Sequence, residues 1–359
     1  MNKNIIFYIP SIEGGGVEKN FNLLIKYLPK IIGKIHIITA DKRNDNSKNI
    51  NYVCPNSNYW NKKNRIFKNI ICIYLLIKNF WSAKAVIFSF QSNITTIIIS
   101  KILGFRVLIR LNTSLKKYLK NFFKRNIFKF FYSLSDIIIV NSKFFQKELN
   151  EVNLKSHLIY NLSANKKKRK RLNFFKRFNG LKILNIGRLT DQKDQITLIK
   201  SLEILKKKNI NFRCCIIGRG TSRNILINKI KRLNLEKNIK LVGFKNNAEY
   251  YISESDIFVL SSKFEGLPNV LIEAQKYGIP IISSNCPTGP NEILMNGKLG
   301  ELFPVGNYNI LANKLLNFLK DKKILKAKSL DAIKYLKRFD PLINSKKYSS
   351  LILKEYEKI

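Results

Sequence analysis

The pair of side chains whose spacing most clearly predicts chemistry is Glu265 and Glu273, which have seven residues between them. The first lies in a predicted loop and the second more than one turn inside a predicted helix, so a helix N-terminus falls between them. The open backbone amides of a helix N-terminus bind phosphate, and a carboxylate on either side can accept hydrogen bonds from sugar hydroxyls. A phosphate flanked by two polyols describes a nucleotide sugar. The amides in question belong to Gly266, Leu267, Asn269 and Val270, and we expect the last three residues to bind the donor phosphates.

The elements that must position the two glutamates follow from the residues around them. The apolar run 256–262 (DIFVLSS) predicts a strand directly before the loop. Pro268 is predicted at the first helical position, where its missing N–H removes no intrahelical hydrogen bond. The helix is expected over 269–277, because Gly278 is a typical helix end and Pro280 prevents continuation.

The whole string 264–280 (FEGLPNVLIEAQKYGIP) resembles the paired-glutamate motif of the retaining, GT-B-fold glycosyltransferases of family 4, also called group 1. The continuation 283–294 (SSNCPTGPNEIL) resembles bacterial polysaccharide and glycan transferases of this family. The resemblance implies that Glu265 approaches the donor sugar as a catalytic carboxylate and that Glu273 holds the ribose. Taken singly, either glutamate would more often be a solvated residue, an alternative that the complete string disfavours.

The resemblance also implies the α/β GT-B fold, in which two Rossmann-like doubly wound domains face each other across a cleft. Strand and helix patterns alternate along the chain, as parallel sheets of βαβ units require. The expected organisation is an acceptor-binding domain at 1–165, a basic linker at 166–180 and a nucleotide-sugar-binding domain at 181–340. The resemblance implies that a C-terminal helix at 341–359 crosses back to the first domain. Strands are expected at 4–9, 35–39, 85–90, 106–110, 136–140, 157–160, 182–186, 213–217, 240–244, 256–260 and 279–283, and the clearest helices at 17–28, 194–206, 309–320, 325–338 and 342–358.

Composition bounds the class of protein. A length of 359 residues suggests two domains, and an apolar content of 45% suffices for two buried cores. The 5 cysteines are odd in number and lack metal spacing, and neither His36 nor His157 has a ligand-like neighbour. A reduced, cytoplasmic protein without a zinc site is therefore expected. The longest apolar run, 70–77, is far shorter than the ~20 residues that span a bilayer, so neither a transmembrane segment nor a signal peptide is predicted.

The charge is the outlier in the composition, because 66 lysines and arginines against 23 acidic residues give a net charge of +43. A field of this sign favours an anionic partner, either lipid headgroups or nucleic acid. A coding sequence rich in A and T would also leave an excess of lysine on solvated faces, and the two explanations have comparable weight. Nucleic acid is the weaker partner, because no aromatic-basic reading motif or known nucleic-acid-binding module is present.

Two segments of the first half, 62–81 and 116–131, combine basic and apolar residues. On a helix, the second segment gathers apolar side chains near one another with lysine and arginine around them, a pattern typical of a helix that lies in a membrane interface. A helix packed on a core with a solvated basic face has the same pattern, and both interpretations remain open. The apolar side chains are Leu119, Phe122, Phe123, Ile127 and Phe130.

Cationic side chains are expected at the donor diphosphate. Arg188 and Lys193 lie five residues apart in the loop after a predicted strand, where the resembling family carries an arginine and a lysine that bind this group. The charge of the departing diphosphate must be neutralised, either by a divalent metal held by acidic residues or by cationic side chains and helix ends. No convincing Asp-x-Asp pair is present, so we expect no metal and no other cofactor. The resemblance also implies that Gly15 and Gly16, in the glycine run after the first strand, face the donor phosphates.

The nucleoside is expected at the ends of neighbouring strands of the second half. Phe244 and Asn247 resemble the nucleobase wall of the family, and Gly218 ends the strand before them. The resemblance favours uridine, the commonest base among these enzymes. Phe244 as an ordinary core residue is an equally weighted alternative.

The acceptor side matches the family only loosely. Many members carry a histidine in the loop after the strand matched here by 106–110, whereas this chain has Asn112 in that loop. An amide can donate a hydrogen bond to the sugar but cannot act as a general base. In retaining transfer by front-face displacement, an oxygen of the diphosphate itself can take the proton of the acceptor. Asn112 therefore remains a candidate catalytic residue without the role of a base.

These observations favour a retaining glycosyltransferase that moves a sugar from a nucleotide-sugar donor, in this family usually a UDP-sugar, onto a lipid-linked or lipopolysaccharide-type glycan. The expected partners are the donor, the glycan acceptor and an anionic membrane surface, with no nucleic acid. The expected location is cytoplasmic, at the inner face of the plasma membrane. One alternative is a nucleotide-sugar epimerase or a soluble sugar-phosphate transferase of the same fold. The other, on charge alone, is a basic nucleic-acid-binding protein.

Overall fold

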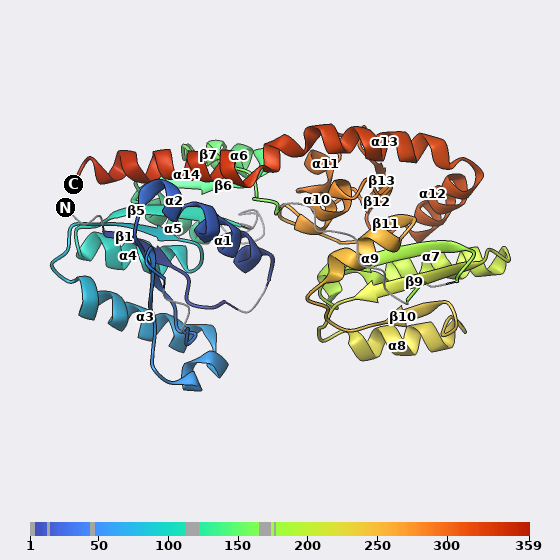
Figure 1. The fold of residues 1–359 in the computed structure, drawn as a ribbon, viewed down its shortest axis with the longest axis horizontal. Coiled ribbons are helices and arrows are strands. Elements are labelled where there is room, and N and C mark those ends of the chain that lie inside the picture. The colour runs from blue at the N-terminus through green and yellow to red at the C-terminus, as the bar shows by residue number, and fades with distance from the viewer. Residues whose placement is uncertain (1–3, 13–14, 44–46, 113–121, 165–173, 176) are drawn as a thin grey trace. The chain divides into compact units, whose positions relative to one another are not determined.

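The computed structural model describes residues 4–12, 15–43, 47–112, 122–164, 174–175 and 177–359. The chain forms two compact units (Figure 1). Unit 1 consists of Met1–Ala164 together with Arg338–Ile359, and unit 2 consists of Asn165–Lys337. Each unit contains a parallel β-sheet covered by helices, so the expected α/β class with two Rossmann-like units is confirmed.

The sheet of unit 1 has the strand order β3-β2-β1-β4-β5-β6-β7 among the described residues, and all neighbours are parallel. Its central strands are nearly continuous runs of Ile, Val and Phe, because a parallel sheet is buried on both faces. The strands are β1 (Asn4–Tyr8), β2 (Ile35–Ile38), β3 (Ile50–Val53), β4 (Ala85–Ser89), β5 (Arg106–Leu111), β6 (Ile137–Val140) and β7 (His157–Leu158).

Alternate residues of β1 assign the helices of unit 1 to the two faces of the sheet. Phe7 belongs to a core that contains Phe21 and Tyr348, whereas Tyr8 belongs to a core that contains Cys72 and Phe145. The first face is covered by α1 (Gly16–Tyr27), α2 (Pro29–Ile32) and α14 (Pro341–Tyr356). The second face is covered by α3 (Arg65–Phe80), α4 (Asn93–Ile102), α5 (Phe122–Ser133) and α6 (Lys143–Asn150).

Helix α14 belongs to unit 1 although it is the last element of the chain. Tyr348 and Ile352 are fully buried in the core with Phe7 and Phe88, and α14 contacts α1, α2, β4 and β5. The core of unit 1 is thus built from both ends of the sequence.

The sheet of unit 2 has the order β10-β9-β8-β11-β12-β13 among the described residues and is also parallel. The strands are β8 (Leu181–Ile186), β9 (Phe212–Ile217), β10 (Ile239–Leu241), β11 (Ile257–Leu260), β12 (Ile281–Ser284) and β13 (Glu301–Phe303). The helices of unit 2 are α7 (Gln195–Lys207), α8 (Arg223–Arg232), α9 (Ala248–Glu254), α10 (Asn269–Lys276), α11 (Pro290–Ile293), α12 (Tyr308–Lys320) and α13 (Lys322–Lys334), together with the short 3-10 helix η2 (Asp191–Lys193). A second 3-10 helix, η1 (Asn58–Lys62), belongs to unit 1, and a third, η3 (Tyr335–Phe339), spans the boundary between the two units.

Helix α10 is where the sequence pattern predicted it, with one correction. Pro268 is the residue before the helix, with ψ of 105°, and is not the first helical residue. An extended residue at this position still turns the chain from the loop into the helix. Gly278 has φ of +65° and follows Tyr277, the residue that caps the C-terminus of the helix, in the left-handed conformation that glycine adopts without strain.

Part of the expected exposed linker at 166–180 is packed against unit 2. Phe175 is only 3% exposed, and the Arg213 guanidinium lies 4.5 Å from the ring centre of Phe178. The aromatic residues of this segment therefore act as packing groups. The basic run 166–171 lies outside the described residues. Among the helices that the structure describes, none combines the length and the apolar character needed to cross a bilayer.

Candidate functional site

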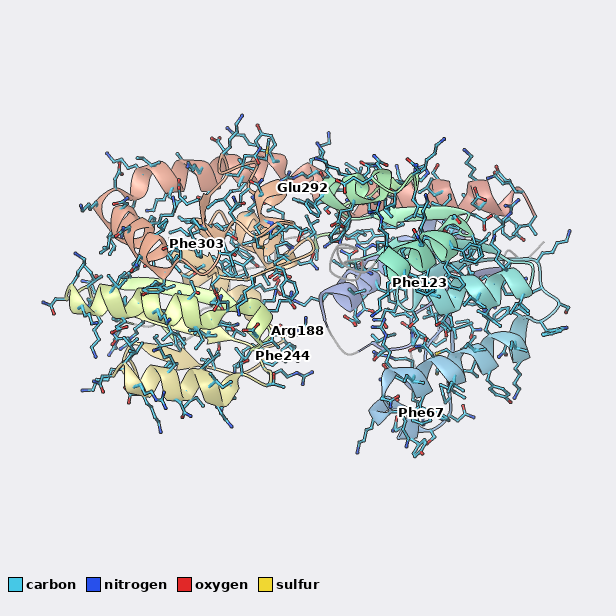
Figure 2. All side chains as sticks on the ribbon, turned by 180° about the vertical axis from the view of Figure 1, so that it is seen from behind. Phe67, Phe123, Arg188, Phe244, Glu292 and Phe303 are labelled. Atoms are coloured by element: carbon cyan, nitrogen blue, oxygen red, sulfur yellow. The ribbon has the colours of Figure 1, made fainter. Side chains whose placement is uncertain are left out.

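The loops that follow β8, β9 and β10 meet at one edge of the sheet of unit 2. The amide of Leu189 donates to the carbonyl of Arg219 at 2.9 Å, and the amide of Gly218 donates to the carbonyl of Gly243 at 3.0 Å. This edge is formed by the carboxyl ends of parallel strands, where open α/β sheets bind their ligands. Figure 2 shows Arg188 and Phe244 at the same end of unit 2.

Gly218 is required by the close approach of two of these loops. A Cβ atom added at this residue would lie 1.8 Å from the carbonyl oxygen of Gly187. Any other residue would push the loop after β8 away from the loop after β9. The structure thus gives Gly218 a packing role at the edge where the sequence predicted nucleoside binding, and that binding role stays a prediction.

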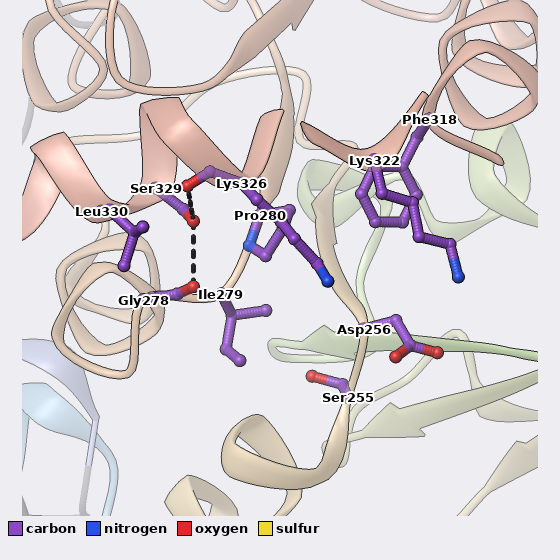
Figure 3. Close-up of a pocket in the computed structure, with 10 residues that line it drawn as sticks. All are labelled: Ser255, Asp256, Gly278, Ile279, Pro280, Phe318, Lys322, Lys326, Ser329 and Leu330. Carbon is purple, nitrogen blue, oxygen red and sulfur yellow. Dashed lines mark hydrogen bonds between the residues drawn. The ribbon is translucent and has the colours of Figure 1, made fainter. Parts of the chain in front are cut away.

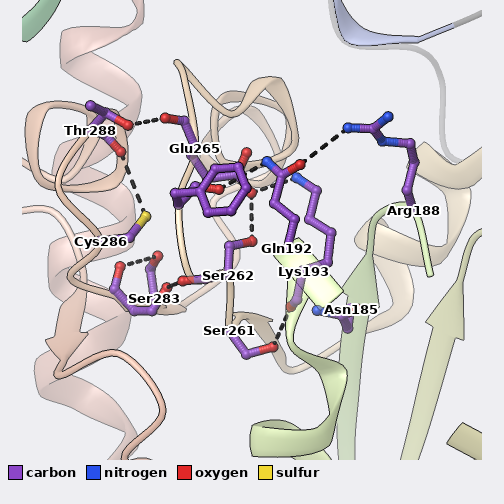
Figure 4. Close-up of polar contacts among 12 residues, drawn as sticks. Asn185, Arg188, Gln192, Lys193, Ser261, Ser262, Glu265, Ser283, Cys286 and Thr288 are labelled. Atoms are coloured by element: carbon purple, nitrogen blue, oxygen red, sulfur yellow. Dashed lines mark hydrogen bonds and ion pairs between the residues drawn. The ribbon is translucent and has the colours of Figure 1, made fainter. Parts of the chain in front are cut away.

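Glu265 is the most enclosed carboxylate of this edge. It is 8% exposed, its Oε1 lies 2.5 Å from Lys193 Nζ, and it accepts a hydrogen bond from Ser262 Oγ at 2.5 Å (Figure 4). A buried carboxylate needs such partners, because an unpaired charge away from water is costly. The alternative that Glu265 is a solvated surface residue is therefore wrong.

The loop that carries Glu265 is fixed from the β12 side. Thr288 Oγ1 donates to the backbone carbonyl of Glu265, and Ser284 Oγ donates to the carbonyl of Ser262 at 2.6 Å. Thr288 lies in the segment 283–294 that resembles the glycan transferases. These hydroxyls hold the backbone on either side of the carboxylate, so its position is set by two strand ends.

The loop after β8 brings the predicted arginine and lysine to the same edge. Ser261 Oγ donates to the Lys193 carbonyl at 3.1 Å, which fixes the residue that pairs with Glu265. Arg188 is exposed, and its Nη2 donates to the side chain of Gln192 at 3.2 Å (Figure 4). Gln192 in turn donates to the carbonyl of Phe264 at 3.0 Å. Arg188 and Lys193 are therefore both tied to the glutamate loop.

The N-terminus of α10 follows the Glu265 loop directly. Leu267 is buried, and Asn269 and Val270 are the first two residues of the helix. The amide of Leu271 donates to the carbonyl of Pro268 at 3.0 Å, so the helical hydrogen bonding begins there. Glu273 is half-buried one turn further along the same helix. The helix N-terminus thus lies between the two glutamates along the chain, as the sequence predicted.

The β9 and β10 ends carry an aromatic and a cationic group in contact. The Arg219 guanidinium lies 5.2 Å from the ring centre of Phe244, which is 49% exposed. The alternative that Phe244 is a core residue is therefore wrong. Asn247 is exposed at the start of α9. Arg219 was missed as a site residue, although its place between two glycines after a strand was a usable signal.

The nearest thiol to this edge is held in its protonated form. Burial raises the pKa of Cys286 to about 12, and the Glu265 carboxylate adds to the effect. The Sγ atom donates to the carbonyl of Thr288. A thiol with such a pKa is a poor nucleophile at neutral pH, so Cys286 serves packing at this site.

The remaining predicted residues belong to unit 1 and are described within it. Asn112 Oδ1 accepts from Arg110 at 2.6 Å, and its Nδ2 donates to the carbonyl of Phe90 at 3.0 Å. Gly15 precedes the first turn of α1 and Gly16 is the first residue of that helix. The structure places the two glycines at a helix N-terminus, and it shows Asn112 held by a buried arginine. Their roles toward a donor or acceptor stay predictions.

Two further features of unit 2 help to define the candidate site. Within the described residues, no group of three or more His, Cys, Asp or Glu side chains is arranged to hold a metal ion. A cavity of about 230 Å³ lies at the opposite, amino-terminal edge of the sheet, where Asp256 and Pro280 precede β11 and β12 (Figure 3). Ser329 on α13 donates to the carbonyl of Gly278 there. This cavity is separate from the glutamate edge.

Residues 165–337 match the family described as Glycosyl transferases group 1, and these residues coincide with unit 2. Unit 2 is therefore similar to that family, and the match covers 173 of the 359 residues. A glycosyltransferase of Methanocaldococcus jannaschii is 35% identical over 199 residues, which cover 51% of this chain and 48% of that protein. An N-acetylgalactosamine-N,N'-diacetylbacillosaminyl-diphospho-undecaprenol 4-alpha-N-acetylgalactosaminyltransferase of Campylobacter jejuni is 31% identical over 235 residues, 62% of each chain. The chain thus spans about half of the first relative and less than two thirds of the second.

The fold likeness extends over the entire chain. The crystal structure of Anabaena HepE in complex with UDP-glucose has a TM-score of 0.79 and 16% identity, and the match covers 100% of both chains. At this identity the likeness shows the fold alone. It confirms the GT-B fold class expected from the sequence.

Proposed function

We propose that this protein transfers a sugar from a nucleotide-sugar donor to a glycan acceptor with retention of anomeric configuration. The observation that carries the proposal is the enclosed Lys193–Glu265 pair beside the N-terminus of α10. The carboxylate can accept a hydrogen bond from a sugar hydroxyl. The lysine and the helix N-terminus can bind phosphate oxygens.

Each part of the donor has a chemically suitable partner at this edge. The face of Phe244 with the Arg219 guanidinium suits a nucleobase, which stacks on aromatic and guanidinium planes. Glu273 suits the two ribose hydroxyls, because a carboxylate can accept a hydrogen bond from each. Arg188 and Lys193 suit the diphosphate.

The proposed reaction breaks the bond between the anomeric carbon and a diphosphate oxygen and forms a bond between that carbon and an acceptor hydroxyl. The proton of the hydroxyl passes to the departing diphosphate. Arg188, Lys193 and the start of α10 stabilise the charge that develops there, and we propose that they do so without a metal ion. Glu265 orients the donor sugar through a hydroxyl as the bond breaks.

For the substrates, we propose a UDP-sugar and an acceptor carried on a polyprenyl diphosphate lipid. The support is that HepE was solved with UDP-glucose and that the C. jejuni relative is named for a diphospho-undecaprenol substrate. A lipid-linked acceptor would place the protein at a membrane surface, on the cytoplasmic side where nucleotide sugars are made. The net charge of +43 supports attraction to anionic lipid there.

The test incubates the purified protein with a series of UDP-sugars and glycosylated undecaprenyl diphosphate acceptors in detergent. We expect a product larger by one sugar, with the anomeric configuration of the donor sugar retained by NMR. An epimerised nucleotide sugar formed without acceptor would favour the alternative of an epimerase. Inverted configuration in the product would contradict the retaining mechanism while leaving the transferase assignment intact.

A further inference from the structure

The outward side of the helices that cover one face of the unit 1 sheet carries an unusual set of exposed apolar residues. Helices α3, α4 and α5 all pack inward on the same core, the one that contains Tyr8. Their outward residues are therefore on the same side of unit 1. We call this outward side, formed by α3, α4 and α5, the α3–α5 face. Figure 2 labels Phe67 of α3 and Phe123 of α5 on it.

Helix α3 has two apolar sides. Cys72, Leu76 and Phe80 are buried at i, i+4 and i+8, which is the spacing of one helix face. Ile66, Ile70 and Tyr74 repeat the same spacing but are exposed, with Ile66 at 70%. The exposed row cannot result from packing in the core. Trp81, also exposed, continues it at the end of the helix.

Helix α5 repeats this arrangement. Phe128 and Tyr132 pack toward the core, whereas Phe123, Ile127 and Phe130 are exposed at i, i+4 and i+7. Phe123 is 72% exposed. Helix α5 thus packs on the core as the alternative expected, but its outward side also carries apolar residues. Leu119 and the side chain of Phe122 lie outside the described residues. On α4, Ile98 and Ile102 are exposed at i and i+4.

The sequence around these rows is strongly cationic. Between Asp45 and Asp136 the sequence contains no Asp or Glu, whereas it contains 16 Lys and Arg. Lys78 on α3 and Lys124 and Lys129 on α5 are exposed on the helices that carry the apolar rows. Asp41 pairs with the buried Lys68, and Asp136 pairs with Lys101 and Arg106, so these three cations have acidic partners from outside the segment. The segment 46–135, which includes the whole of α3, α4 and α5, keeps a large excess of positive charge beyond these pairs.

We propose that the α3–α5 face docks on an anionic lipid bilayer, with the exposed Ile, Phe, Tyr and Trp side chains at the acyl boundary and the lysines at the headgroups. Apolar rows flanked by basic side chains are the arrangement of interfacial helices, and anionic lipid complements the charge. A second copy of the chain is disfavoured as the occupant, because a self-complementary contact would bring two faces of the same charge together. This proposal rests on the proposed function only for the membrane location.

The experiment measures sedimentation of the full-length protein with vesicles of phosphatidylcholine alone or mixed with phosphatidylglycerol. We expect binding only with the anionic lipid, weakened but not abolished by high salt. Two variants, I66S/I70S/Y74S and F123S/I127S/F130S, remove one row each without changing charge. Each should weaken vesicle binding at least tenfold, and the two together should abolish it, because apolar burial accounts for a large part of interfacial affinity.

The matched control is I225S/I324S/L330S, which removes three exposed apolar side chains of unit 2, each 61 or 62% exposed in the native protein. It should bind vesicles like wild type. Circular dichroism and UDP binding confirm that each variant is folded. Wild-type vesicle binding by both row variants, or equal binding to neutral vesicles, would overturn the proposal. So would a wild-type dimer that the row variants convert to monomer, because it would identify a second copy as the occupant.

Transfer to a detergent-solubilised acceptor separates this proposal from the proposed function. If the row variants lose vesicle binding and keep transfer in detergent, both stand. If wild type binds anionic vesicles through these rows but transfers no sugar, only the proposed function fails. If it transfers sugar but does not bind vesicles, only the docking proposal fails.

Discussion

Lys193 Nζ lies 2.5 Å from Glu265 Oε1, although the two are 72 positions apart in the sequence. The contact joins the loop after β8 to the loop after β11, which are neighbouring strands of the sheet. A lysine paired with a carboxylate can exchange that partner for a phosphate oxygen, which frees the carboxylate for a hydroxyl. The pair thus links the proposed phosphate-binding position to the proposed sugar-binding position. We expect the function of each residue to depend on the other.

Glu265→Gln is expected to lower turnover by about 10²-fold or more, because the amide cannot offer the charge that the proposed sugar contact uses. UDP affinity should change much less, since UDP carries no donor sugar. Steady-state kinetics and calorimetry with UDP measure the two effects. Glu203→Gln, on the surface of α7, is the matched control and should have wild-type kinetics. Wild-type turnover of the Glu265 variant would remove this residue from the mechanism.

Glu273→Ala is expected to weaken donor binding more than tenfold. A hydrogen bond to a charged group contributes about 1.5–3 kcal/mol, and the alanine variant loses the proposed bonds to the ribose. Calorimetry with UDP and with UMP should show the same loss, because both carry the ribose. Unchanged affinity for both nucleotides would refute the ribose assignment, whatever happened to turnover.

Sugar transfer is expected to survive chelation by EDTA. In the proposed mechanism, Arg188, Lys193 and the start of α10 neutralise the departing diphosphate, so a divalent ion is not needed. The measurement is the initial rate before and after dialysis against EDTA. Complete loss of activity with recovery on adding Mg²⁺ or Mn²⁺ would show that a metal performs this role.

Asp136 is expected to stabilise unit 1 in a pH-dependent manner. Burial acts to raise its pKa, but the Val107 amide and the side chains of Lys101 and Arg106 donate to the carboxylate and lower the pKa overall. The contribution is therefore present above the unfolded pKa of about 3.9 and is lost as the pH falls through the lower folded value.

Urea unfolding of Asp136→Asn should show a loss of about 1–2 kcal/mol at pH 7, since the two cationic partners are partly solvated. The difference from wild type should shrink at pH 3. Asp331→Asn serves as the control, because its pairing with Lys334 is exposed and should contribute little at either pH. A difference that does not depend on pH would mean that the carboxylate charge is not what stabilises the fold.

The sequence alone was sufficient for the elements with strong local signals. Helix α10 was predictable within one residue at each end, because Pro268 and Gly278 mark its ends. The edge strands β3 and β13 were missed, since they are only three or four residues long and their residues are mostly half-buried. Phe175 was placed in an exposed linker, because a basic composition says nothing about which aromatic group finds a partner.

The candidate site was likewise predictable only in part. The residue types of the glutamate edge could be predicted from spacing and resemblance, but its pairings could not. Which cation meets Glu265, and that Arg219 contacts Phe244, depend on which strands are neighbours in the sheet. The exposed row of α3 was likewise hidden, because both of its apolar sides satisfy the same helical period.

The position of α14 has a consequence for the order in which the chain can fold during synthesis. Tyr348 and Ile352 fill the core of unit 1, yet they follow all of unit 2 in the sequence and are made after it. Residues 165–337, by contrast, contain all the elements of unit 2. All residues of unit 2 are therefore made before α14, and until α14 is made the α1 side of the unit 1 sheet is covered, among the described helices, only by α1 and α2. We therefore expect that unit 1 cannot complete its core before unit 2 has been synthesised, and that a premature stop near residue 340 would destabilise unit 1, the unit that is translated first.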